Sequence, residues 1–157
     1  MTTTTFADYA AAAEARKDIA AKVLAHSLEL CEALRQNYIN YAIRMSKVSM
    51  SRDGASTEYY EERIAKLEKG ICDVDFTLDT GRKYHKIWHV DSGGSRSCHA
   101  FIDKKTGEVY KPASYKAPAK GVRFNLLIIK EREYLLNPAN CDWAGGYLYR
   151  NSSYFCS

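Results

Sequence analysis

The chain has 157 residues, of which 46% are hydrophobic and 27% charged, and its formal net charge is +4. This is a globular composition, and the length predicts a single domain, residues 1–157, while excluding two sizeable lobes. Five scattered cysteines without a CxxC pair, together with the lack of a secretory signal or a long apolar run, predict a cytoplasmic protein without a disulfide framework or membrane segment.

Residues 6–48 predict one long helix, because they are rich in Ala, Leu, Glu, Lys and Arg and contain neither Pro nor Gly. Asp8 is the candidate N-cap. Apolar residues recur every three or four positions along two lines, one including Leu30 and the other including Leu28. Burial of one face of the helix would therefore leave one of the two apolar lines exposed.

The length of this helix constrains the architecture. A single rod would span about 65 Å at 1.5 Å per residue, whereas a compact domain of this size has a radius of gyration of about 15 Å. The helix must break, project or pack against another copy. We favour a homo-oligomer assembled through this helix, with a break near Asn37–Asn40 as the alternative.

A second, shorter helix follows, with the sequence TEYYEERIAKLEK. Ser56 or Thr57 is its predicted cap, and Gly70 is its predicted end. From Phe76 onward the pattern changes to the period of strands, so the fold class is α+β. We expect a helical half over residues 1–72 and an antiparallel sheet half over residues 73–157.

Four short runs rich in β-branched and aromatic residues, FTLD, KYHKIWHV, SRSCHAFID and GEVYK, predict an antiparallel β-meander. Asp91–Gly94 and Lys104–Gly107 are the predicted hairpin turns. Pro112 and Pro118 then bound a loop that is not a central strand, since proline lacks a ladder donor.

The C-terminal part predicts three more elements. VRFNLLII favours a strand, KEREYLL a short helix, and NPANCDWAGGYLYR a turn followed by a strand. Trp143 is the expected aromatic anchor of that last strand, and Gly145 and Gly146 would let its backbone approach the sheet closely.

Positive charge concentrates between Gly81 and Arg123. Ten Lys and Arg against three Asp and Glu give this segment +7, so the rest of the chain carries −3. Interleaved aromatic rings add flat faces for bases to the cations that phosphates require. We predict an anion site on the sheet face and the Pro-bounded loop, formed by Arg96, Lys111, Ser114, Tyr115, Lys120, Arg123 and Asn125.

Within this predicted site we expect Arg123 to matter most, because a guanidinium can grip two phosphate oxygens. The two prolines would stiffen the loop and lower the ordering cost of binding. Lys104 and Lys105, at a hairpin tip, are expected to be nearly dispensable. The alternative is a solvated basic loop with Tyr115 in the core.

His85 and His89 share a strand face close to Cys98 or His99, which makes a zinc cluster conceivable. The spacing follows no metal motif, however, and we interpret these residues as sheet histidines and a core cysteine, with no metal or cofactor. Cys98 and His99 are adjacent strand residues that face apart, which argues against a thiol nucleophile. We therefore expect a protein that is not an enzyme.

The blocks HAFIDKKTGEVYKPASYKAPAKGVRFNLL and DWAGGYLYR, within residues 83–150, resemble a family of small bacteriophage proteins. That family shares an H-A-F-[IV]-D-x-x-T-G-x-[IV]-Y-K-x-A block, a P-A-K-x-x-R block and a terminal W-A-G-G-Y-L-Y block. The resemblance implies a phage origin and action in the cytoplasm of an infected bacterium. It implies no particular activity.

Two functions follow as hypotheses. The first is binding of a phosphate-bearing nucleotide signal or a single-stranded nucleic acid, which in a phage would counter host defence. The alternative is a protein-interaction module, either a host-protein inhibitor or a virion component, that acts through the long helix.

Overall fold

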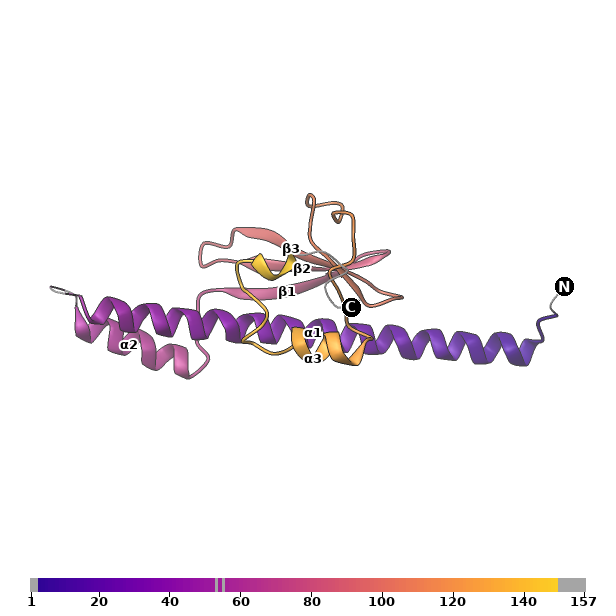
Figure 1. Ribbon diagram of the computed structural model, residues 1–157, viewed down its shortest axis with the longest axis horizontal. Coiled ribbons are helices and arrows are strands. Elements are labelled where there is room, and N and C mark those ends of the chain that lie inside the picture. The colour runs from indigo at the N-terminus through magenta and orange to yellow at the C-terminus, as the bar shows by residue number, and fades with distance from the viewer. Residues whose placement is uncertain (1–2, 53, 55, 150–157) are drawn as a thin grey trace.

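The computed structural model describes residues 3–52, 54 and 56–149 and shows the predicted α+β fold (Figure 1). Its elements are α1 (Phe6–Met50), α2 (Thr57–Glu68), β1 (Asp75–Thr80), β2 (Tyr84–Val90), β3 (Arg96–Asp103), β4 (Glu108–Tyr110), β5 (Phe124–Asn125), α3 (Ile129–Leu135) and the 3-10 helix η1 (Gly146–Leu148). The strands pair in sequence order as one antiparallel sheet, which confirms the predicted meander.

Helix α1 runs unbroken, so the alternative of a break near Asn37–Asn40 is wrong. The N-cap is Thr5 and not the predicted Asp8. The Asp8 N–H donates to Thr5 Oγ1 at 3.1 Å, and the Asp8 carboxylate accepts from the Thr5 N–H at 3.5 Å. Asp8 therefore acts from the third helical position, as the second half of a capping box.

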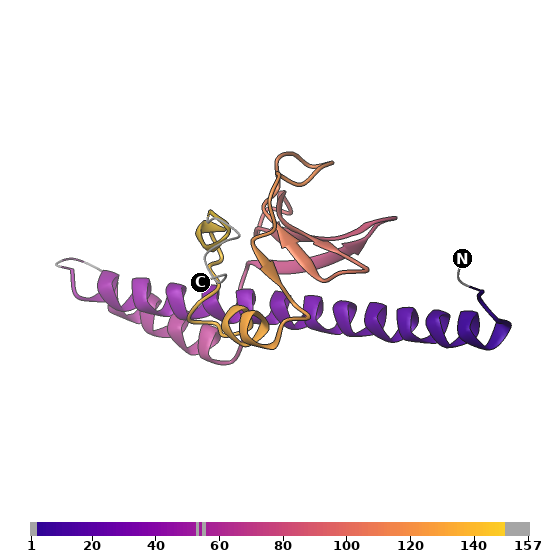
Figure 2. The ribbon, with the colours of Figure 1, turned by 45° about the vertical axis from the view of Figure 1, so that its right-hand side comes forward.

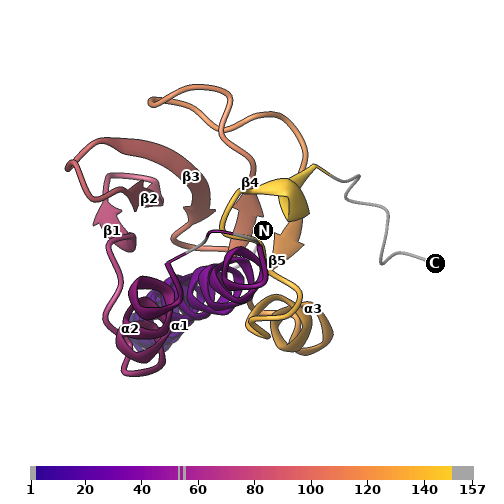
Figure 3. The same cartoon turned by 90° about the vertical axis from the view of Figure 1, so that its left-hand side faces the viewer.

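The central part of α1 packs against the inner face of the sheet, which is the face turned toward the helix. Leu30 and Leu34 of α1 are fully buried in one cluster with Ile87, Ile102 and other strand residues. Alternation along each strand sends these apolar side chains to the same face. Figure 3 shows the sheet above α1, with α2 and α3 on either side of the helix.

The N-terminal part of α1 continues past the edge of the sheet, as Figures 1 and 2 show. We call residues 6–22 the projecting segment. The first buried residue of the helix is Val23, whereas Phe6 is 83% exposed and Tyr9 is 60% exposed. Of the three possibilities for a helix of this length, projection is the one the monomer shows.

The turns largely follow their predicted chemistry. Gly94 and Gly107 adopt positive φ angles of 82° and 76°, as the two hairpin turns require. Gly70 ends α2 with φ of 82°. In contrast, VRFNLLII contributes only the short strand β5, because Asn125 turns the chain toward α3 through a hydrogen bond from the Leu127 N–H to its Oδ1 at 2.8 Å.

The predicted C-terminal strand is wrong for the described residues, where the chain instead crosses α1 and forms η1. Asn37 of α1 holds this segment by donating to the Pro138 carbonyl at 2.8 Å and accepting from the Trp143 N–H at 2.9 Å. The Trp143 ring packs on Tyr38 and Tyr41, with centroids 5.3 and 5.0 Å apart. Trp143 therefore anchors this segment to the helix.

In the described ranges, no helix combines the length and apolarity needed to cross a bilayer. Four of the five cysteines, Cys31, Cys72, Cys98 and Cys141, are free thiols, and Cys156 lies outside the described residues.

Replacing Trp143 by Ala should lower the free energy of unfolding by about 3 kcal/mol, because it removes a half-buried indole from two tyrosine rings. Trp143→Phe keeps an aromatic ring there and should cost much less. Urea unfolding measures both variants. Equal stabilities of Trp143→Ala and the parent protein would contradict the anchoring role.

Candidate functional site

The outer face of the sheet, which points away from α1, carries Trp88 and Phe101, two aromatic residues of the basic segment between Gly81 and Arg123. Lys86 faces Phe101 across β2 and β3, and Trp88 faces Cys98. Phe101 is 1% exposed and Trp88 is 7% exposed, although neither belongs to the core clusters that α1 forms. The Pro-bounded loop, residues 111–123, rises from β4 on this side of the sheet and bends back over β3 (Figure 3).

Arg96 lies on this face, but its charge already has partners. Its guanidinium sits 4.2 Å from the centre of the Trp88 ring and pairs with Asp79 Oδ2 at 3.4 Å. The Trp88 indole N–H donates to the same oxygen at 2.8 Å. An anion that bound Arg96 here would have to compete with Asp79.

The Pro-bounded loop is closed by a bridge within itself and attached to the sheet by a side chain of β2. Pro112 and Pro118 form a β-bridge, and Lys86 Nζ donates to the Tyr115 carbonyl. The Tyr115 ring is 65% exposed and lies 6.1 Å from Trp88. The alternative of a core Tyr115 is therefore wrong, and its ring is accessible for stacking.

The other predicted residues occupy separate places. Lys111 lies 4.1 Å from the centre of the Tyr149 ring, in a crevice that His89 and His99 also line. Ser114 accepts a hydrogen bond from the Lys116 N–H at 3.2 Å within the loop, and Lys120 is exposed.

The last two, Arg123 and Asn125, flank Phe124 at the return to the sheet. The Arg123 N–H donates to the Val109 carbonyl at 2.8 Å, and the Asn125 side chain is used in the turn before α3. The structure thus brings Arg96 and Tyr115 together at Trp88, whereas Lys111 and Asn125 lie elsewhere. Whether the seven residues bind an anion stays a prediction.

A second basic surface was missed by the sequence reasoning. It is a groove of about 820 Å³ between the N-terminal part of α1 and the β1–β2 and β3–β4 hairpin turns. We call it the basic groove. Six cationic residues line it: Arg16 and Lys17 from α1, Arg82 and Lys83 from the β1–β2 turn, and Lys104 and Lys105 from the β3–β4 turn.

One backbone hydrogen bond and one side-chain hydrogen bond hold the two hairpin tips together. The Lys104 N–H donates to the Lys83 carbonyl at 3.1 Å, and Lys104 Nζ donates to the Gly81 carbonyl at 3.0 Å. The backbones that carry the cations of both tips are therefore held together before any ligand arrives, which lowers the ordering cost of binding.

The charge of the basic groove is almost unopposed. Among the described lining residues the one carboxylate is Asp103, whose Oδ1 accepts from the Lys105 and Thr106 N–H groups at 2.8 and 3.1 Å. Within the described part of the chain, none of the six cations forms an ion pair. Cations that converge in a groove raise the local concentration of anions.

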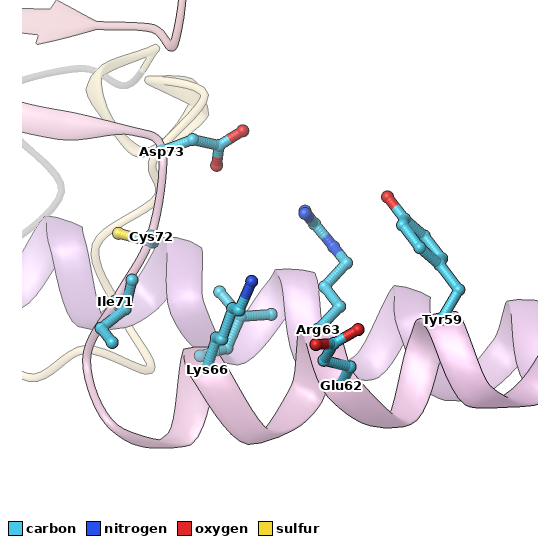
Figure 4. A pocket seen from close by; sticks show the side chains of 8 residues that line it. Tyr59, Glu62, Arg63, Lys66, Ile71, Cys72 and Asp73 are labelled. Atoms are coloured by element: carbon cyan, nitrogen blue, oxygen red, sulfur yellow. The ribbon is translucent and has the colours of Figure 1, made fainter.

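A smaller pocket, of about 330 Å³, lies between α2 and the linker to β1 (Figure 4). Figure 4 shows Tyr59 and Arg63 projecting to the same side from neighbouring turns of α2, while Asp73 projects from the linker. Its described lining contains Glu62 and Asp73 as well as Arg63 and Lys66. These charges cancel, so this pocket does not favour an anion as the basic groove does.

Among the described residues, no group of three His, Cys, Asp or Glu gathers that could hold a metal ion. Burial raises the pKa of Cys98 to about 11, so its thiol stays protonated near neutral pH. Burial lowers the pKa of His99 to about 3, and His99 Nε2 shares a hydrogen bond of 2.8 Å with the Tyr147 hydroxyl.

Residues 6–150 match the family described as "Family of unknown function (DUF7717)", and the chain belongs to that family. No curated protein and no solved structure matches the chain.

The buried neutral His99 should make stability depend on pH. In the unfolded chain His99 has its ordinary pKa of 6.5 and is protonated below that pH. In the folded protein it stays neutral down to about pH 3. The free energy of unfolding should therefore fall with decreasing pH across this window, by up to about 1.4 kcal/mol per pH unit from this group. Urea unfolding between pH 7.5 and 4.5 measures the slope.

The control is His99→Gln, which keeps a hydrogen-bonding side chain but cannot titrate. It retains His85 and His89, whose pKa values burial also lowers, so the difference between the two slopes isolates His99. Identical slopes would show that His99 does not titrate as a buried group.

Proposed function

We propose that this member of the DUF7717 family binds a phosphate-bearing ligand, a nucleotide or a single-stranded nucleic acid, in the basic groove. One observation carries the proposal: six cations converge on one groove whose described lining has a single carboxylate, and that carboxylate is used in a turn. Cations without a carboxylate partner are what phosphate groups bind.

Several features support binding without catalysis. The Cys98 thiol has a raised pKa, and His99 is buried against Tyr147. A nucleophile is activated by a lowered pKa or by a hydrogen-bonded base. The pKa of Cys98 is raised, and among the described residues no hydrogen bond joins its thiol to His89 or His99, which line the same crevice. The ligand would be sequestered and released unchanged.

The outer face has a subordinate part in this proposal. Tyr115 offers an exposed ring, but Arg96 beside it already pairs with Asp79. If the protein comes from a phage, as its sequence blocks suggest, sequestering a nucleotide signal or a nucleic acid of the host would counter defence.

The basic groove gives Lys104 and Lys105 a larger role than the sequence suggested. We expect Lys104→Ala with Lys105→Ala to weaken binding of a fluorescein-labelled 12-residue oligothymidylate at least about tenfold. The slope of log K against log salt should fall by about 1.4, since each single-strand phosphate contact contributes about 0.7. Fluorescence anisotropy at several salt concentrations measures both quantities. A second series with ATP in place of the oligonucleotide tests binding of a mononucleotide.

The matched control is Lys47→Ala with Lys66→Ala, which removes two exposed charges at the opposite end of α1 and on α2. Arg123→Lys tests the outer face in the same assay. Equal losses in the groove variant and the control would mean diffuse attraction to net charge and would contradict a site in the groove. A loss confined to Arg123→Lys would move the site to the Pro-bounded loop.

A second candidate, self-association through α1, rests on a different observation. Leu24 and Leu28 lie one turn apart on α1 and are 39% and 50% exposed. They belong to the second apolar line, which the sheet does not cover. Burying them between two copies would stabilise a closed dimer.

Sedimentation velocity at micromolar concentration tests this candidate. The parent protein should sediment above its monomer mass of 17.8 kDa, and Leu24→Glu with Leu28→Glu should restore the monomer, because the contact would bury like charges. A parent protein that sediments only as a monomer would rule this dimer out.

A further inference from the structure

We infer that the first two turns of the projecting segment, which lie beyond the groove-lining Ala13, extend the basic groove into a track for single-stranded nucleic acid, with Phe6 and Tyr9 as stacking platforms for unpaired bases. The inference rests on the proposed function of the groove and adds the class of ligand.

The helix period places these rings on the face of α1 that lines the groove farther along the helix. Ala13 and Ala20 of α1 line the groove, and Phe6 and Tyr9 precede Ala13 by seven and four residues. Residues at these spacings share one helix face. The face that lines the groove therefore continues along the projecting segment and carries both aromatic rings.

Both rings are accessible. Phe6 and Tyr9 are 83% and 60% exposed, and within the described residues neither ring packs against another aromatic ring. Residues 10–13 are four alanines, so the surface between the rings and the groove has only short side chains. A flat base can approach a ring there without displacing a bulky neighbour.

The geometry favours a single strand over the other phosphate ligands. From Phe6 to Arg16 the helix rises about 15 Å at 1.5 Å per residue, so a ligand that contacts both must be several nucleotides long. A duplex hides its base faces in its own stack, whereas a single strand presents them to aromatic side chains. A mononucleotide held by the groove cations would not reach the rings.

A second copy of the chain fits this face less well. In a closed symmetric dimer the same surface meets itself, so the groove cations of the two copies would approach each other. Like charges across an interface are costly, and the groove has no free carboxylate in its described lining to offset them. A polyanion neutralises the same cations.

The test uses Phe6→Ala with Tyr9→Ala, beside Phe6→Leu with Tyr9→Leu, which keeps apolar bulk but removes the rings. Binding is measured by anisotropy with the labelled 12-residue oligothymidylate, with the same strand in a duplex, and with ATP. Circular dichroism confirms that both variants keep their helix, as expected for exposed positions.

We expect both variants to bind the single strand at least about tenfold more weakly than the parent protein, as expected for two lost stacking contacts. Affinity for ATP and for the duplex should be unchanged. The Lys104→Ala, Lys105→Ala variant tests the proposed function separately from the stacking rings. If the groove binds phosphate, this variant should lose affinity for all three probes.

Two results would overturn the inference. If Phe6→Leu with Tyr9→Leu binds the single strand with the affinity of the parent protein, the contact is apolar and does not involve stacking. Sedimentation that shows a dimer in the parent and a monomer in Phe6→Ala with Tyr9→Ala would assign the projecting segment to a second copy.

Discussion

The packing of the central part of α1 on the inner face of the sheet determines the shape of this protein. Burial of Leu30 and Leu34 against strand residues fixes the helix along the sheet. The helix is longer than the sheet that it crosses, so both of its ends extend beyond it. Helix α2 packs on the C-terminal end, whereas the N-terminal end stays uncovered in the monomer (Figure 1). The basic groove lies where this uncovered end passes the hairpin tips.

The topology of the sheet explains why the cations converge. Alternate turns of an antiparallel meander lie at the same end of the sheet, so the β1–β2 and β3–β4 turns meet although about twenty residues separate them. The backbone hydrogen bond from Lys104 to Lys83 joins these tips. Both tips then face the α1 residues Arg16 and Lys17, and a basic surface forms from three distant segments.

The two basic surfaces differ in how their charge is used. On the outer face, Arg96 is stacked and paired, and Lys86 holds the Pro-bounded loop, so these cations stabilise the fold. In the basic groove, Asp103 turns its carboxylate to backbone N–H groups, and the cations have no acidic partner in the described chain. Net charge along the sequence does not distinguish these two situations.

The sequence by itself determined the features that depend on neighbouring residues: the helix and strand periods, the hairpin glycines Gly94 and Gly107, and the α+β class. Only the tertiary structure decided that α1 stays unbroken, that Trp143 packs on α1, and that Arg16 lines the same groove as Lys104. The physical reason is that local periodicity reports which face of an element is apolar. The partner that covers this face, and the charges gathered beside it, depend on contacts between residues far apart in the chain.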